Sequence, residues 1–179
     1  MRRRPPVPPE RSHGFAPILG SAPRLLILGS LPGIASLRAA EYYAHPRNLF
    51  WDAMGELIGA GREVPYAARV AALQARGIAL WDVIQDATRA GSLDASIVLS
   101  DARHNDILSL LGTAPTLKAV AFNGAAAAAL FKRRIGAAAL ALRPDLTYLR
   151  LPSTSPANAG LSRIQKLAAW QALSGFVPA

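Results

Sequence analysis

The 179-residue sequence contains no cysteine. This absence excludes disulfide bonds, thiolate zinc sites and iron–sulfur clusters held by cysteine. No apolar run approaches the roughly 20 residues that a membrane-spanning helix requires. The basic, proline-rich start of the chain also lacks the apolar core of a signal peptide. We therefore expect a cytoplasmic protein with no membrane partner.

Histidine is scarce as well, and His13, His45 and His104 are too few to indicate a histidine metal site. The chain has no G-x-G-x-x-G fingerprint and no Walker loop. The segment GSLPG (29–33) does not match the nucleophile elbow of serine hydrolases. We therefore expect no metal and no other cofactor.

Acidic residues are few, with 11 Asp and Glu against 20 Lys and Arg, which gives a net charge of +9. Such an excess is consistent with a polyanionic partner. It is almost entirely arginine, however, in a chain also rich in alanine, glycine and proline, and Arg2, Arg3 and Arg4 can simply be solvated. Charge alone leaves nucleic-acid binding open.

The chain length is that of one domain, and half of the residues are apolar. We expect residues 1–22 to form a flexible, basic, proline-rich arm and residues 23–179 to form a single α/β domain. The sequence contains no signal for oligomerisation, so a monomer is the default expectation.

Alternating strand and helix patterns follow the arm. Four apolar runs predict buried strands at 24–28, 77–83, 117–122 and 146–151. Helical periodicity and capping signals predict helices at 50–58, at 65–77, from Ser100 or Asp101 to Gly112, from 125 to the basic run 132–134, and from Ser162 onward. Residues 85–96 are too irregular to assign. This alternation predicts a three-layer αβα fold around a central, mainly parallel four-stranded sheet.

Polar residues follow the carboxyl end of every predicted strand, at the edge where α/β proteins bind ligands. They are Ser30, Tyr43, His45, Arg47 and Asn48 after the first strand, Asp82 after the second, Asn123 after the third, and Ser153, Thr154, Ser155 and Asn158 after the fourth. We predict that these residues line one crevice, which can hold a planar polar ring and the phosphates around it.

Each of these residues also has a purely structural interpretation. Asn48 suits a helix cap, Asp82 a turn cap, and Asn123 with Gly124 a common turn. His45 before a proline suits a turn, while the tyrosines and serines suit a rim and an ordinary loop. Only their joint placement favours a binding site.

Three segments, GSLPG (29–33), YYAHPRNLFW (42–51) and LPSTSPANA (151–159), resemble the motifs of the uracil-DNA glycosylase superfamily in the same order. With ALWDV (79–83) and FNG (122–124), the chain is most similar to the hypoxanthine-DNA glycosylase branch, also called deoxyinosine glycosylases or family 6. The resemblance implies a monofunctional base excision repair enzyme. Such an enzyme flips a deaminated base, hypoxanthine or uracil, out of DNA and hydrolyses its N-glycosidic bond.

The chain departs from this pattern in two places. Ser30-Leu31 lies where several branches carry a water-activating Asp or Asn, and Leu151 lies where many have a base-contacting His or Asn. In the hypoxanthine branch, the resemblance implies that Asn48 takes the role of this missing residue and orients the attacking water. The missing acid also supports an alternative, a nucleic-acid-binding protein that keeps the pocket but lacks catalysis. A third interpretation, a small-molecule nucleoside hydrolase, would not need a basic surface.

The remaining residues receive roles from the chemistry of the reaction. His45, or backbone N–H groups near Ser30, would stabilise the departing base anion. Tyr43 would stack on the flipped base, Asp82 would accept N1–H of hypoxanthine, and Asn123 would meet its carbonyl edge. The expected DNA contacts are Arg47, Ser153, Thr154, Ser155 and Asn158, with Leu161 as the expected wedge. No lysine lies at a predicted strand end, so we expect no lyase activity.

Overall fold

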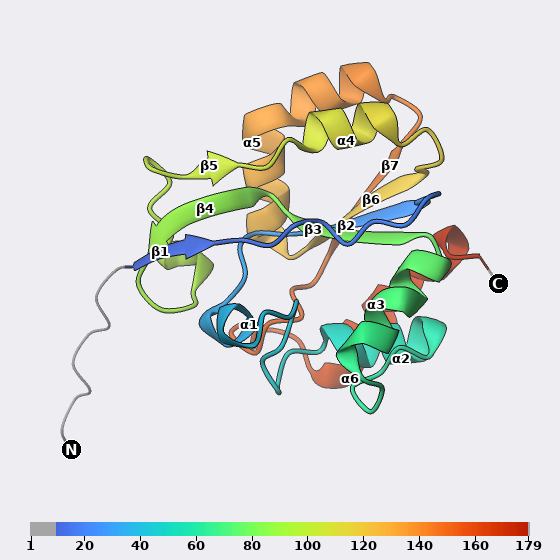
Figure 1. The fold of residues 1–179 in the computed structure, drawn as a ribbon, viewed down its shortest axis with the longest axis horizontal. Coiled ribbons are helices and arrows are strands. Elements are labelled where there is room, and N and C mark those ends of the chain that lie inside the picture. The colour runs from blue at the N-terminus through green and yellow to red at the C-terminus, as the bar shows by residue number, and fades with distance from the viewer. Residues whose placement is uncertain (1–9, 179) are drawn as a thin grey trace.

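A computed structural model describes residues 10–178 of the chain (Figure 1). Its central sheet has four parallel strands in the spatial order β3-β2-β6-β7. These strands are β2 (Leu25–Gly29), β3 (Ile78–Asp82), β6 (Ala119–Asn123) and β7 (Thr147–Leu151). All four lie where the apolar runs predict them, and the expected parallel sheet is confirmed.

Helices cover both faces of this sheet (Figure 1). One face packs against α4 (Ile107–Thr113) and α5 (Ala125–Leu142), and the other against α2 (Phe50–Ile58), α3 (Tyr66–Ala75) and α6 (Arg163–Trp170). Strand β2 is therefore buried on both faces: Leu26 and Leu28 belong to one hydrophobic core, and Leu25 and Ile27 to the other. Burial on both faces is why its sequence is continuously apolar. The predicted three-layer αβα architecture is confirmed.

A second, antiparallel sheet was not predicted. It consists of β1 (Glu10–His13), β4 (Ile84–Arg89) and β5 (Arg103–His104), in the order β1-β4-β5. Strand β4 follows β3 after a single residue. It buries two charged residues, Asp86 and Arg89, which interrupt the apolar pattern by which a strand is recognised.

The expected boundary of the N-terminal arm differs from the structure. Strand β1 pairs with β4, and the buried Ile18 forms a bridge with Leu80 of the central sheet. Residues in the range 10–22 therefore pair with both sheets, and the structure there differs from the expected flexible arm. Residues 1–9 lie outside the described part of the chain.

Two predicted helices also differ in their bounds. Helix α4 begins after Asp106, whose carboxylate accepts the Ser109 N–H at 3.1 Å, and not at Ser100 or Asp101. Helix α5 continues past the basic run 132–134 because the alanines and leucines that follow are strong helix formers. The short α1 (Ile34–Ala39) and the two 3₁₀ helices η1 (Asp94–Ser96) and η2 (Gln171–Phe176) were not predicted.

The last helix begins as predicted. Ser162 and Gln165 form a reciprocal capping box at the start of α6, with Ser162 Oγ accepting the Gln165 N–H at 3.2 Å. Within residues 10–178, no helix has the length and apolar character needed to cross a membrane.

Candidate active site

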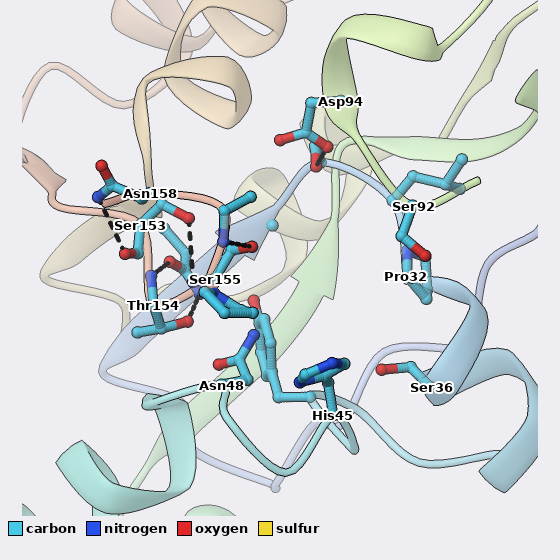
Figure 2. Close-up of a pocket in the computed structure, with 18 of the residues that line it drawn as sticks. Pro32, Ser36, His45, Asn48, Ser92, Asp94, Ser153, Thr154, Ser155 and Asn158 are labelled. Atoms are coloured by element: carbon cyan, nitrogen blue, oxygen red, sulfur yellow. Dashed lines mark hydrogen bonds between the residues drawn. The ribbon is translucent and has the colours of Figure 1, made fainter. Parts of the chain in front are cut away.

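A cavity of about 1020 Å³ opens at the carboxyl edge of the central sheet. Every site residue predicted from the sequence lines it: Ser30, Tyr43, His45, Arg47, Asn48, Asp82, Asn123, Ser153, Thr154, Ser155 and Asn158. Figure 2 shows His45 and Asn48 on one side of this space, the 153–158 loop on another, and Ser92 and Asp94 across from them. The predicted convergence of strand ends is therefore present in the structure.

The loop that carries the aromatic motif is held at several points. The Tyr42 N–H donates to the Tyr66 hydroxyl at 3.0 Å, and the Trp51 indole N–H donates to the Tyr42 carbonyl at 2.8 Å. Tyr43 has a positive φ of 55°, an uncommon conformation for a residue with a side chain, and its ring stacks on Phe50 at 4.2 Å. These contacts fix the backbone that leads to His45 and Asn48.

Asn48 combines a structural contact with free hydrogen-bonding capacity. Its Oδ1 accepts the Phe50 N–H at 3.0 Å at the start of α2, but the N-cap residue of that helix is Leu49, so Asn48 is not the helix cap that the structural interpretation expected. A carbonyl oxygen has a second lone pair, and within residues 10–178 the Asn48 Nδ2 donates no hydrogen bond. The hydrogen bond to Phe50 therefore fixes the side chain and leaves groups that can hold a water molecule in the cavity.

His45 has a defined tautomer. Its Nδ1 accepts the Arg47 backbone N–H at 3.1 Å, which requires a lone pair on that nitrogen. The hydrogen of the neutral ring is then on Nε2, which makes Nε2 a donor. His45 lines the cavity with this donor available for a ligand.

Asp82 is buried at the end of β3, and its Oδ2 has no hydrogen-bond partner in the described structure. Burial, reinforced by the negative charge of nearby Asp94 and opposed by Arg89, raises the pKa of the Asp82 carboxyl to about 7. The buried Tyr43 hydroxyl also lacks a partner, and burial raises its pKa, so it remains a neutral donor. The cavity wall thus presents two unsatisfied polar groups, which buried sites rarely leave without a function.

Asn123 and Thr154 bind each other at the cavity wall. The Asn123 Nδ2 donates to the Thr154 hydroxyl at 2.8 Å, and the Thr154 N–H donates to the Asn123 Oδ1 at 2.9 Å. Thr154 is only 1% exposed, so its hydroxyl is not available to a DNA phosphate, contrary to the prediction. This pair positions the 153–158 loop against the end of β6.

Hydrogen bonds inside the 153–158 loop also shape its surface. Ser153 Oγ accepts the Ser155 N–H and Ser155 Oγ accepts the Ala157 N–H, both at 3.2 Å. The Asn158 Nδ2 donates to the Ser153 carbonyl at 3.1 Å. The Leu49 N–H donates to the Thr154 carbonyl at 3.0 Å, which joins this loop to the one that carries Asn48.

The structure adds residues that the sequence analysis missed. Asp94 lies 2.5 Å from the Ser30 hydroxyl and lines the cavity together with Ser92 and Leu93. The buried Arg89 donates hydrogen bonds to the carbonyl oxygens of Leu31 and Pro32, and these bonds hold the GSLPG turn (29–33) in place. These residues come from the segment 85–96, which shows no regular pattern from which they could have been found.

Arg150, by contrast, carried a signal in the sequence. It is a single charged residue inside the apolar run of β7, and its side chain is exposed and lines the cavity. Its place next to the end of a predicted strand indicates a group at the ligand edge. Within residues 10–178, no cluster of His, Asp and Glu is arranged to hold a metal ion.

Comparisons with known proteins agree with this geometry. Residues 17–174 match the family model of the uracil DNA glycosylase superfamily. A protein named hypoxanthine DNA glycosylase from Methanosarcina acetivorans is 34% identical over 164 residues, covering 90% of this chain and 96% of the relative. One with the same name from Methanosarcina barkeri is 41% identical over 115 residues, covering 64% and 72%.

A solved structure is similar as well. It is a solution NMR structure of a Methanosarcina acetivorans protein provisionally named as a uracil DNA glycosylase. The TM-score is 0.73 at 31% sequence identity, with 92% of this chain and 99% of that chain covered. The similarity therefore extends over the whole αβα domain, including the edge that carries the cavity.

Proposed function

Because the chain belongs to the uracil DNA glycosylase superfamily, we propose that it is a monofunctional DNA glycosylase that excises hypoxanthine from DNA. The relatives named hypoxanthine DNA glycosylase support this base over uracil. The observation that carries the proposal is that Asn48, His45, Asp82 and Tyr43 line one cavity, with hydrogen-bonding groups left free for a ligand. A second deaminated base, uracil, is the secondary substrate in this proposal.

Access to the base requires the nucleotide to leave the duplex stack, which costs a few kcal/mol. Contacts to the DNA backbone supply part of this energy and fix the register without reading sequence. Arg47 and Arg150 are exposed, line the cavity and form no ion pair with any residue from 10 to 178. We assign phosphate binding to these two arginines, together with Ser153, Ser155 and Asn158 on the neighbouring loop.

The flipped base would then lie against Tyr43 and Asp82. A tyrosine face stacks on any base, so Tyr43 supplies affinity without much selectivity. Deamination of adenine replaces the N1 lone pair by an N1–H donor, and the ionised Asp82 carboxylate accepts a hydrogen bond but cannot donate one. Asp82 therefore favours hypoxanthine over adenine when it is ionised. Asn123 contributes through the loop that it holds, since its amide is engaged with Thr154.

Cleavage of the glycosidic bond leaves positive charge on the sugar and negative charge on the departing base. In the proposed mechanism Asn48 orients the water that attacks the sugar. An amide is a weak base, so bond breaking must run ahead of water attack. The His45 Nε2–H donates to the departing base and stabilises its negative charge. Asn48 and His45 are held by one turn, in which the Asn48 N–H donates to the His45 carbonyl at 2.9 Å.

The product in this proposal is an intact abasic strand. A lyase step requires an amine that can attack the sugar. None of Lys118, Lys132 and Lys166 lines the cavity, and the Lys166 ammonium donates to the Ser155 carbonyl at 3.1 Å, behind the loop.

The test uses labelled duplexes that carry inosine, uracil, xanthine or a normal base. Wild-type protein and Asn48→Ala are incubated with each duplex, and one half of every sample is treated with alkali before a denaturing gel. We expect alkali-dependent scission at inosine with wild-type protein, and a loss of about 100-fold or more in Asn48→Ala. The matched control is Gln171→Ala, which removes an exposed amide that binds the Glu56 carboxylate and does not line the cavity.

Three results would contradict parts of the proposal. Scission at uracil alone would keep the superfamily and reject the base preference. Scission without alkali would reject the monofunctional product. No scission at any lesion, with duplex binding intact, would favour a binding protein that lacks catalysis.

A further inference from the structure

Asp94 is an acidic side chain in the cavity that the proposed function assigns to DNA. It is exposed, it lines the cavity, and it forms no ion pair with any residue from 10 to 178. The buried Arg89 guanidinium is near enough to attract it, but its hydrogen bonds go to the Leu31 and Pro32 carbonyls. A carboxylate in this place repels DNA phosphates and so weakens substrate binding. Another step of the reaction must offset this cost if the carboxylate is to benefit the enzyme.

The Asp94 carboxylate is held in a defined position. Its Oδ1 accepts a hydrogen bond from the Ser30 hydroxyl at 2.5 Å, a short distance typical of a hydroxyl bound to a charged acceptor. The backbone around it is also held: the Ser92 hydroxyl accepts the Ile34 N–H at 3.0 Å, and the Asp94 carbonyl accepts the Ile97 N–H at 3.1 Å. A charge fixed in this way does not need to reorganise during a reaction, which is the condition for effective electrostatic stabilisation.

The position of this charge lies between the groups assigned to the base and those assigned to the phosphates. Asp94 binds the residue after Gly29, and the Gly29 backbone lies against Asp82 and Tyr43, the groups assigned to the base. Asp82 is buried and Asp94 is exposed, so Asp94 lies nearer to solvent. The 153–158 loop, assigned to the phosphates, lies across the cavity from Asp94 (Figure 2). The sugar of a bound nucleotide joins its base to its phosphates, and it must therefore pass Asp94.

We infer that Asp94 is a catalytic residue whose carboxylate stabilises the positive charge that develops on the sugar as the glycosidic bond breaks. This inference rests on the proposed function. The bonding electron pair leaves with the base, so the sugar becomes an oxocarbenium-like cation. Water then adds to the sugar carbon, and the proton that it loses neutralises the departed base anion. Because the carboxylate attracts the cation and repels the phosphates of the intact substrate, it favours the transition state over the bound substrate.

Two DNA duplexes that cannot be cleaved test this charge separately from the chemistry. One carries a neutral tetrahydrofuran ring at the target position. The other carries a pyrrolidine ring, whose protonated nitrogen puts a positive charge at the position of the sugar carbon that bears the base. The affinity for both duplexes is measured, together with the single-turnover rate of excision from an inosine duplex. Excision is measured at about pH 9, because Asp94 contributes to the raised pKa of Asp82, and Asp82 is ionised at that pH with or without this contribution.

Three variants are compared with wild-type protein. Asp94→Asn removes the charge and keeps an oxygen that can accept the Ser30 hydroxyl. Ser30→Ala removes this hydrogen bond and keeps the charge. Glu56→Gln is the matched control for charge, since Glu56 is an exposed acid on α2 that binds Gln171 and does not line the cavity.

We expect wild-type protein and Glu56→Gln to bind the pyrrolidine duplex about tenfold or more tightly than the tetrahydrofuran duplex, and Ser30→Ala to retain a preference for it. Asp94→Asn should bind the two duplexes within about twofold of each other. It should also bind the tetrahydrofuran duplex at least as tightly as wild type and yet excise hypoxanthine about tenfold or more slowly. A purely structural role of Asp94 would not produce this combination of tighter binding and slower excision.

A preference for the pyrrolidine duplex that survives in Asp94→Asn would overturn the inference, and so would a wild-type rate of excision in that variant. A loss of excision in Ser30→Ala but not in Asp94→Asn would show that the hydrogen bond matters and the charge does not, which would overturn it as well. If wild-type protein excises no lesion, the proposed function fails, while the ratio of the two affinities still decides whether Asp94 attracts a cation at this position.

Discussion

Gly29 and Asp82 are paired across the neighbouring strands β2 and β3, and the Asp82 carboxylate lies directly against the Cα of Gly29. A Cβ on Gly29 would overlap the Asp82 Oδ1 and would lie 2.9 Å from the Tyr43 hydroxyl. Glycine at this position therefore lets a carboxylate and a phenol meet at one point of the cavity wall. Because Asp82 is enclosed in this way, its charge depends on pH in the physiological range.

Excision of hypoxanthine should consequently depend on pH through Asp82. The carboxyl has a pKa of about 7, and in the proposed mechanism only its ionised form selects for N1–H. We expect kcat/KM on the inosine duplex to rise about fivefold between pH 6 and pH 7, as for the titration of a single group. Asp82→Asn should lose this rise and change the preference between inosine and uracil. An equal loss on every base, with the pH dependence retained, would show that Asp82 is only structural.

The same pKa predicts an effect on stability. The folded protein binds the Asp82 proton more tightly than the unfolded chain, whose carboxyl titrates near its ordinary value of 3.8. The stability associated with this proton is therefore complete below pH 3.8 and is lost as the pH rises to about 7. The full loss is about 4 kcal/mol. Asp82→Asn should accordingly raise the Tm relative to wild type more at pH 8 than at pH 4.

Arg62 should act as a positioning residue for catalysis. Its Nη2 donates to the backbone carbonyls of His45 and Asn48, and its Nε lies 3.3 Å from an Asp52 oxygen. Without these hydrogen bonds, the turn that carries the His45 and Asn48 side chains can shift. Small displacements of catalytic groups lower the reaction rate strongly. We expect Arg62→Ala to lower kcat on inosine duplex by about tenfold with KM within about twofold.

Arg163→Ala is the matched control for Arg62. Arg163 binds the other oxygen of Asp52 at 3.0 Å but contacts neither carbonyl, so its loss removes the same charge and leaves the turn held. Arg62→Lys keeps the positive charge and an N–H donor group and should recover part of kcat. If the two alanine variants behaved alike, the effect would come from charge or from Asp52 and not from the turn.

Sequence patterns predicted β2, β3 and β6 because these strands are buried along almost their whole length, so that Leu25 to Leu28, for example, form a continuous apolar run. The antiparallel sheet escaped prediction because its stability depends on distant partners. The charged side chain of Asp86 in β4 can be buried because Arg11 and Arg103 form ion pairs with it. Arg11 is 75 residues away in the sequence. The local pattern of apolar and polar residues therefore gives no indication of such a pairing.

The same distinction applies to the site. A local hydrogen bond of Asn48 could be predicted, because Asn48 and Phe50 are two residues apart, although the N-cap residue is Leu49. The mutual bonds of Asn123 and Thr154 join positions 31 residues apart, so the sequence showed two polar residues at strand ends but not that they satisfy each other. Asp94 was missed for a similar reason, since its partner Ser30 is 64 residues away.

Arg47 and Arg150 line the cavity and form no ion pair in the described part of the chain, and they predict how duplex binding responds to salt. A side chain that neutralises one phosphate releases about one counterion, so each contact adds about 0.9 to the slope of log K against log salt concentration. We expect Arg47→Ala and Arg150→Ala each to weaken binding to any duplex and to lower that slope by about one. The measurement is a titration of an inosine duplex and its normal counterpart over a series of salt concentrations.

Lys118→Ala is the control for charge alone. Lys118 is exposed just before the start of β6, at the opposite edge of the sheet from the cavity, so it removes one positive charge far from the proposed DNA path. It should leave the slope unchanged. If all three variants reduced the slope equally, the net charge of the protein and not a defined backbone contact would govern binding. If wild-type binding to the duplex hardly changed with salt, a free nucleoside would be the better substrate, because a neutral nucleoside displaces no counterions.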